Sequence, residues 1–149
     1  MISFRKITKK NVWDVVELNA GEKGHTYVAL NSHTLLEAIF DNKLLYVRAI
    51  YINNDLIGLT YFYPYRNTVW ISRFMIDHKY QGKGYGSKSF SKLLKYIKNK
   101  YSPTKIELST SNPIAIKLYK KYGFINNKNK RTSKFYKKYK EKLLTLQLK

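Results

Sequence analysis

The chain has 149 residues, 44% of them hydrophobic, which is enough for one domain with a buried core. It contains no cysteine, which excludes disulfides, thiolate metal sites and a cysteine nucleophile; its three histidines show no ligand spacing, so we expect no metal. Twenty-nine basic and nine acidic residues give a net charge of +20, which attracts polyanions.

The same composition bears on location and partners. No apolar run is long enough to span a bilayer, and the N-terminal residues lack the apolar segment of a signal peptide. We therefore expect a cytoplasmic protein that does not bind membranes. A nucleic-acid-binding protein is an alternative, but the lysines are spread along the chain, densest after Asn126, and no nucleic-acid-binding motif accompanies them. We favour a well-solvated basic surface.

The first part of the chain predicts one strand and two helices. A short strand covers residues 3–7, and Thr8 can cap a helix that ends near residue 20. Residues 21–31 lack periodicity and predict a loop. Ser32 can cap a second helix, whose apolar residues predict its inner face: Leu35, Leu36, Ile39 and Phe40.

The middle of the chain predicts an antiparallel meander followed by a helix. The three strands of the meander cover residues 44–52, 56–63 and 68–76, with short turns at 53–55 and 64–67. The helix covers residues 84–100, because Phe90, Leu93, Leu94, Ile97 and Tyr101 recur at helical spacing.

The last part predicts a strand at residues 105–109, parallel to residues 68–76 because a helix connects them. Asn112 caps a further helix that ends at Gly123. Strands begin at Phe124 and cover residues 144–148. Between them lies a basic loop or hairpin arm with partly buried aromatic residues: Phe135, Tyr136 and Tyr139. The order β-α-α-β-β-β-α-β-α-β-β predicts a single α/β domain, residues 1–149, with a mixed sheet.

A glycine-rich loop separates the strand at residues 68–76 from the long helix. The first N–H groups of a helix have no intrahelical partner, and the helix dipole favours negative charge there, so the loop predicts a phosphate site. Its spacing matches neither the Walker loop nor the dinucleotide fingerprint. The loop reads Gln81-Gly82-Lys83-Gly84-Tyr85-Gly86.

This loop resembles the acetyl-CoA loop of the GNAT superfamily of N-acetyltransferases, whose signature is Gln/Arg-x-x-Gly-x-Gly/Ala. A second block, from Asn112 to Phe124, is similar to the family's Asn-x-x-Ala-x-x-Leu-Tyr-x-x-x-Gly-Phe. Both blocks occur in the family's order, and the resemblance covers residues 56–124. It implies a GNAT-like acyl-CoA N-acyltransferase fold with a splayed central strand pair and acetyl-CoA as co-substrate.

The resemblance also implies where acetyl-CoA binds. Its pantetheine arm would pair with the strand at residues 68–76, in a V-shaped gap beside residues 105–109, and its pyrophosphate would sit on the loop amides. The implied cofactor contacts are Phe74, Met75, Ile76, Gln81, Gly82, Lys83, Gly84, Tyr85, Gly86, Ser87, Asn112 and Ala115. Four lysines are candidates for the 3′-phosphate: Lys88, Lys117, Lys120 and Lys121.

Tyr119 matches the family's general acid, which protonates the departing CoA thiolate. A phenol with a pKa near ~10 is protonated at neutral pH. The alternative, one aromatic residue in an apolar helical stripe, is less favoured within the second block. The general base stays open. Many members use a glutamate on the strand where this chain has Trp70 and Ser72; Glu107 is a candidate, Asp77 is expected to cap the loop, and deprotonation through water needs no base.

Residues 70–86 further resemble the bacterial diamine and spermine/spermidine acetyltransferase branch, as do residues 27–31. We therefore expect a small-molecule amine acceptor, first a polyamine, with a protein lysine, a protein N-terminus or an antibiotic as alternatives. Expected substrate contacts are Tyr27, Glu22 and Ser72, although related sequences carry an acid at Ser72. Other nearby acids are Glu17, Glu37 and Asp41. By analogy we expect a homodimer, with residues 142–149 available for strand exchange.

Overall fold

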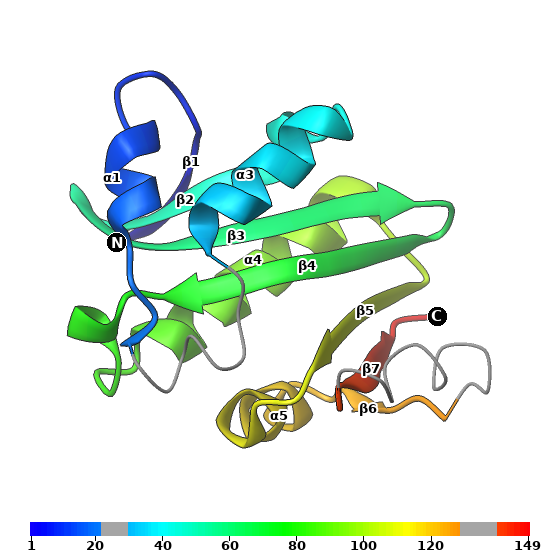
Figure 1. The fold of residues 1–149 in the computed structure, drawn as a ribbon. Helices are drawn as coiled ribbons and strands as arrows, with labels where there is room; N and C mark the ends of the chain where they lie inside the picture. The colour runs from blue at the N-terminus through cyan, green and yellow to red at the C-terminus, as the bar shows by residue number, and fades with distance from the viewer. Residues whose placement is uncertain (22–29, 129–139) are drawn as a thin grey trace.

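The fold was examined in a computed structural model, which describes residues 1–21, 30–128 and 140–149 (Figure 1). Seven strands form one mixed sheet in the order β1-β2-β3-β4-β5-β7-β6. Helices α1 and α3 cover one face and α4 covers the other (Figure 1). The predicted α/β class and the predicted order of elements are confirmed.

The elements have the following bounds. The strands are β1 Ile2–Lys6, β2 Val47–Ile52, β3 Asp55–Tyr65, β4 Thr68–Ile76, β5 Lys105–Thr110, β6 Ile125–Asn126 and β7 Lys142–Gln147. The helices are α1 Val12–Glu17, α3 Asn31–Phe40, α4 Tyr85–Tyr101 and α5 Pro113–Lys121, with 3-10 turns η1 Leu44–Tyr46 and η2 His78–Tyr80. Strand β4 pairs in parallel with β5, as predicted, and the other neighbours are antiparallel.

Helix α4 follows its sequence pattern closely. Phe90, Leu93 and Ile97 are completely buried against the sheet, while the lysines between them point outward. Full burial of such side chains stabilises the fold by roughly 1.5–3 kcal/mol each, which fixes α4 firmly beneath β4. No helix in the described ranges combines the length and apolar character needed to cross a membrane.

The predicted inner face of α3 is confirmed at Leu35 and wrong at the other three residues. The face that packs on the sheet consists of Asn31, Thr34, Leu35 and Ala38. Leu36, Ile39 and Phe40 are exposed, Phe40 by 82%. The apolar pattern predicts the wrong face because α3 places small and polar side chains against the sheet. One of them is Asn31, whose buried amide hydrogen-bonds the Val15 carbonyl. The predicted cap is wrong too: α3 begins at Asn31, and Ser32 makes no cap hydrogen bond.

Other predicted boundaries shift for local reasons. The Thr8 hydroxyl accepts a hydrogen bond from the Lys10 N–H (3.2 Å), so it stabilises the turn before α1, whose N-cap is Asn11. The predicted strand at residues 44–52 starts with the 3-10 turn η1. The turn after β3 is shorter than predicted because strand pairing continues to Tyr65.

Strand β7 lies between β5 and β6 rather than at the sheet edge. Its four central residues are all buried. The segment proposed for exchange between subunits is thus already paired on both sides within the chain. Residues 22–29 of the predicted loop at 21–31, and the predicted aromatic residues Phe135, Tyr136 and Tyr139, lie outside the described residues.

Gly58 in β3 lies opposite Ile76, and its neighbour Ile57 is an extra residue in the pairing with β2. A Cβ atom at Gly58 would lie 2.3 Å from the Met75 carbonyl oxygen, closer than any real contact. Gly58→Ala should therefore lower the free energy of unfolding by about 2–3 kcal/mol, the usual cost of overpacking, measured by urea denaturation.

Gly86→Ala is the matched control. A Cβ there would meet only Ile76 Cγ1, at an ordinary 3.8 Å, within a helix that favours alanine. Equal stability of wild type and Gly58→Ala would contradict the described approach of β3 to β4.

Candidate active site

Strands β4 and β5 share only part of their length. They pair from Thr68 with Lys105 to Ile71 with Leu108. Beyond these pairs β4 continues to Ile76 and β5 to Thr110 without pairing to each other. Figure 1 shows β5 turning away from β4 at this point. The sheet therefore contains a fork, with backbone N–H and C=O groups of β4 directed into it.

A β-bulge coincides with the start of the fork. Phe62 pairs with Ile71 and Tyr61 pairs with Arg73, so Ser72 is an extra residue of β4. A bulge bends its strand and increases the local twist. Strand β4 therefore stays with β3 and leaves β5 directly after the bulge.

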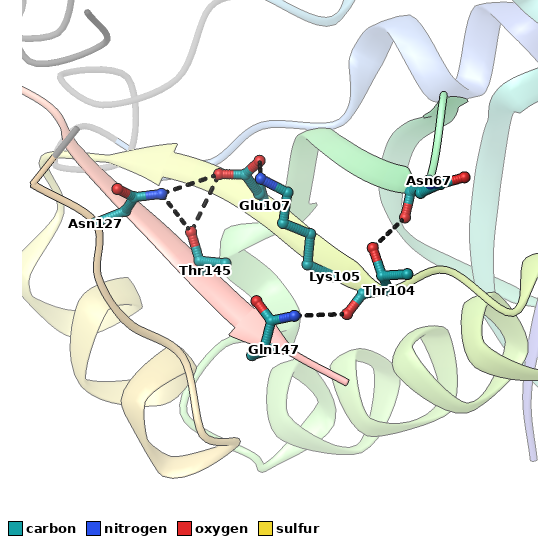
Figure 2. A network of polar contacts seen from close by, with 7 residues as sticks. All are labelled: Asn67, Thr104, Lys105, Glu107, Asn127, Thr145 and Gln147. Atoms are coloured by element: carbon teal, nitrogen blue, oxygen red, sulfur yellow. Dashed lines mark hydrogen bonds and ion pairs between the residues drawn. The ribbon is translucent and has the colours of Figure 1, made fainter. Parts of the chain in front are cut away.

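The closed end of the fork is held by a polar network (Figure 2). The Asn67 carbonyl accepts hydrogen bonds from the backbone N–H (2.8 Å) and hydroxyl (3.1 Å) of Thr104. The Thr104 carbonyl accepts from Gln147 Nε2 (3.3 Å), which joins β7 to the same corner. Strand separation is thus confined to the other end.

Glu107 belongs to this network as well (Figure 2). Its carboxylate pairs with Lys105 Nζ (3.0 Å) and accepts hydrogen bonds from Thr145 Oγ1 (3.1 Å) and Asn127 Nδ2 (3.4 Å). Both oxygens are engaged, so the candidate base has a clear structural task beside β7.

A cavity of about 1000 Å³ runs through the fork. On the α5 side it is lined by Asn112, Ala115 and Tyr119, and on the α3 side by His33, Thr34 and Glu37. The side chains of Ile106 and Leu108 join the α4 core, so Glu107 and Ser109 face the α3 side by strand alternation. The cavity therefore connects the two faces of the sheet.

The glycine loop lies at the N-terminus of α4. Gly82 and Gly84 adopt left-handed φ values of +72° and +82°, which favour glycine. Gly84 is the N-cap and offers no side chain, and its carbonyl accepts from the Lys88 N–H at 3.1 Å. The N–H groups of residues 85–87 precede that bond, so they point beyond the helix end as an anion site requires.

Two polar side chains anchor the loop. Gln81 Nε2 donates to the carbonyls of Ile76 (2.8 Å) and Ala20 (3.1 Å). The buried Asp77 accepts from the N–H groups of Lys79 and Asn19, both at 2.9 Å. Asp77 caps the loop as predicted. Sequence reasoning assigned Gln81 to the cofactor, whereas its side chain here holds the loop against β4.

Tyr119 is buried on α5, its ring 4.8 Å from that of Phe90. Burial raises the pKa of its phenol well above the usual range, so the hydroxyl stays protonated. Among the described residues none hydrogen-bonds this hydroxyl, and Tyr119 is one of the residues that line the cavity. Asn112 caps α5 as predicted, accepting from the Ile114 N–H at 3.0 Å.

Helix α5 is also tied to the first turn of α4. The Tyr122 hydroxyl donates to the Ser87 carbonyl (2.9 Å) and lies 2.8 Å from the Ser87 hydroxyl. The Ser87 side chain is thus engaged with the protein, which leaves its backbone N–H for an anion. This clasp fixes the helix that carries Tyr119 relative to the glycine loop.

On the α3 side, Asn31 links three elements. Its buried amide donates to the α1 carbonyls of Val15 (3.0 Å) and Leu18 (3.3 Å) and accepts from Arg73 Nη2 (3.4 Å). Burial lowers the pKa of Arg73 to about 10, an effect that the charge of Glu37 partly offsets, so the guanidinium remains charged at neutral pH.

The charge of the chain is divided unevenly between its halves. Residues 1–77 hold nine basic and seven acidic residues, whereas residues 78–149 hold twenty basic and two acidic residues. The first half builds α1, α3 and β1–β4, and the second half builds the glycine loop, α4 and α5. The anion-binding part is therefore strongly basic, and the α3 side is almost neutral.

Some expected site residues line the cavity and others do not. Phe74, Asn112, Ala115, Tyr119 and Ser72 do so. Met75 packs between α1, α3 and the sheet, which leaves only its backbone for a ligand. The candidate lysines for the 3′-phosphate, Lys88, Lys117, Lys120 and Lys121, are all exposed. Glu22 and Tyr27 lie outside the described residues.

Several lining residues were missed or only named in passing: Glu37, Lys43, Tyr63, Arg73 and Glu141. They come from α3, β3, β4 and two connecting segments, and no local motif links them. Within the described ranges, no three histidine or carboxylate side chains cluster as metal ligands.

Comparison with known proteins identifies the family to which this chain belongs. The model of the acetyltransferase (GNAT) family matches residues 12–124. The chain belongs to this family. The predicted family and fold are thus confirmed, and the fork, the glycine loop and Tyr119 occupy one acetyltransferase domain.

Individual proteins agree with the assignment. The chain is 29% identical over 133 residues to a spermine/spermidine N(1)-acetyltransferase of Bacillus subtilis, covering 83% of this chain and 87% of the relative. It is similar in fold to a spermidine N-acetyltransferase from Vibrio cholerae in complex with CoA and spermine (TM-score 0.69, 17% identity, 98% and 95% coverage). It is also similar to a GNAT family acetyltransferase from Elizabethkingia anophelis with acetyl-CoA bound (TM-score 0.65, 22% identity, 99% and 98% coverage).

Asn31→Ala would leave the carbonyls of Val15 and Leu18, at the end of α1, without their side-chain donor and remove the contact with Arg73. We expect a loss of about 2–3 kcal/mol in the free energy of unfolding, measured by urea denaturation. Ser32→Ala is the control, because Ser32 makes no cap bond and should change stability by less than ~0.5 kcal/mol. Equal effects of the two substitutions would contradict an anchoring role for Asn31.

Proposed function

We propose that the protein transfers the acetyl group of acetyl-CoA to a primary amine by direct attack in a ternary complex. The observation that carries this proposal is the cavity through the β4–β5 fork, which is lined by Tyr119 on one face of the sheet and by Glu37 on the other. A thioester arm entering from α5 and an amine entering from α3 would meet in it.

The residues present supply the groups that acetyl-CoA would need. The N–H groups of residues 85–87 and the left-handed glycines supply a pyrophosphate site. The part of β4 that leaves β5, residues 72–76, offers backbone groups to the amide-rich pantetheine arm. Exposed lysines of α4 and α5 supply cations for the 3′-phosphate.

Three chemical demands follow. The amine must attack in its neutral form, the tetrahedral oxyanion needs a donor, and the thiolate needs a proton. Tyr119, kept protonated by burial, is proposed as that proton donor. A backbone N–H of β4 inside the fork is proposed as the donor to the oxyanion. Glu107 is fully engaged, so we propose that the amine loses its proton to water.

The acceptor is proposed to be a polyamine or diamine. The Bacillus subtilis relative supports this class, and so do two carboxylates that line the cavity with no ion pair to another described residue, Glu37 and Glu141. They stand out in a chain with nine acidic and twenty-nine basic residues. The nearly neutral charge of residues 1–77 removes much of the repulsion that the net charge of +20 suggests.

The wild-type protein should be stabilised by acetyl-CoA in a thermal-shift titration, because a ligand that binds only the folded state raises Tm. A short DNA duplex should give a smaller effect that vanishes in salt. In a turnover panel measured by CoA release, spermidine, spermine and putrescine should exceed lysine peptides and aminoglycosides.

No thermal shift with acetyl-CoA or CoA would reject the proposed reaction. A shift combined with turnover of peptides or aminoglycosides alone would keep the reaction and replace the acceptor.

Tyr119→Phe should lower kcat by about 10- to 100-fold, toward the modest end of general acid catalysis because a thiolate is a fair leaving group. The Kd of acetyl-CoA should stay within about twofold. Because burial raises the pKa of the phenol, its proton is retained at high pH, and kcat should not fall through ionisation of Tyr119 below about pH 10.

Tyr101→Phe is the matched control, since Tyr101 is half-buried at the far end of α4 and outside the cavity lining. Full activity of Tyr119→Phe, or an equal loss in both variants, would remove Tyr119 as the acid.

A further inference from the structure

Lys43 lies in the cavity on the α3 side, with its backbone rigidly placed. Helix α3 ends in a Schellman motif: the Lys43 N–H donates to the Ala38 carbonyl (2.7 Å) and the Asn42 N–H to the Ile39 carbonyl (3.1 Å). Asn42 adopts the left-handed φ of +54° that this motif requires. The side chain of Lys43 therefore leaves the helix end in a fixed direction, toward β3.

The ammonium group of Lys43 sits on the face of an aromatic ring. Its Nζ is 4.0 Å from the centroid of the Tyr63 ring, and both residues line the cavity. Between described residues the one ion pair within 4.0 Å is that of Lys105 with Glu107, so no carboxylate holds Lys43 at that distance. A half-exposed contact with a ring is weak enough for another cation to replace it.

The surroundings of Tyr63 favour a cation. Burial raises the pKa of the Tyr63 phenol, and the negative charges of Glu37 and Asp41 raise it further, so these carboxylates act on the same ring. Glu37 lines the cavity beside Tyr63. The carbonyl end of α3 adds the negative end of a helix dipole. Figure 1 shows α3 lying across the face of the sheet beside β3.

The position also suits a second charge on the acceptor. Tyr63 pairs with Trp70, two residues before the bulge at Ser72, which is about 7 Å along the strand at ~3.3 Å per residue. That separation is comparable with the length of a four-carbon diamine. An acceptor whose reactive amine enters the fork can thus bring its other ammonium to the Tyr63 ring.

We propose that the face of Tyr63, with Glu37 beside it, is the subsite for the non-reacting ammonium of the acceptor, and that Lys43 occupies this subsite in the free protein as an internal competitor. Lys43 is then a specificity-determining residue: its ammonium must leave the ring before a diamine or polyamine binds, whereas a monoamine needs no such displacement. This inference rests on the proposed function, because it assigns one part of the acceptor site.

The test compares acceptors that differ by one charge. Lys43→Met keeps the length of the side chain and removes its ammonium. It should raise kcat/KM for putrescine and spermidine about three- to tenfold through KM, and change kcat/KM for butylamine less than twofold. Tyr63→Leu should lower kcat/KM for the diamines by a similar factor, and Tyr63→Phe, which keeps the ring, should not.

A binding measurement and a control variant show whether the effect comes from the position of the Lys43 charge or from the loss of any positive charge. Calorimetric titration of spermidine into CoA-saturated protein should give a lower Kd for Lys43→Met than for wild type. Lys9→Met removes the same charge from an exposed position outside the cavity, and should leave both kcat/KM and Kd unchanged.

Three outcomes would overturn the inference while the proposed function stands: no change, a decrease for putrescine in Lys43→Met, or an equal increase for butylamine. If the wild type binds no acetyl-CoA or acetylates no amine, the proposed function fails and the subsite fails with it. Wild-type turnover, measured first, distinguishes the two cases.

Discussion

The pairing of β4 with β5 ends after Ile71 and Leu108, and the other features of the site depend on that limit. A longer ladder would satisfy the backbone groups of residues 72–76 and close the cavity. Two constraints set the limit from opposite ends. The bulge at Ser72 bends β4 away, and the hydrogen bonds around Thr104 hold the strands together at the closed end. The fork is therefore a fixed part of the fold, and ligand binding need not open it.

Polar side chains hold the elements around the fork in fixed positions relative to one another. Gln81 and Asp77 fix the glycine loop to the end of β4, and the Tyr122–Ser87 clasp fixes α5 to α4. Asn31 does the same on the opposite face, where it joins α1, α3 and β4. Because these groups bond to the protein itself, the ligand is left with backbone amides, exposed lysines and a few cavity side chains.

Local patterns were sufficient wherever one element determines the outcome. The spacing of Phe90, Leu93 and Ile97 gave α4, the glycine spacing gave its N-terminus, and Asn112 gave the start of α5. The face of α3 could not be predicted in this way, because the burial of Asn31 depends on carbonyls of α1 and on Arg73 of β4. That Lys43 and Tyr63 line the cavity could not be predicted from the sequence for the same reason, because the two residues meet only when α3 packs on β3.

The uneven charge of the two halves reconciles a net charge of +20 with the proposed cationic acceptor. Charges on the surface are screened over roughly 8 Å at physiological ionic strength, so an incoming amine responds to the groups near the α3 side rather than to the whole chain. Those groups include Glu37 and the carbonyl end of α3, while the excess lysines belong to the half that would meet the phosphates of acetyl-CoA. Within this arrangement a single lysine placed over an aromatic ring changes the charge balance of the cavity more than the eight lysines of α4 and α5 do. We therefore expect acceptor selection in this protein to depend on charges inside the cavity, and total charge is a poor guide to the proposed acceptor.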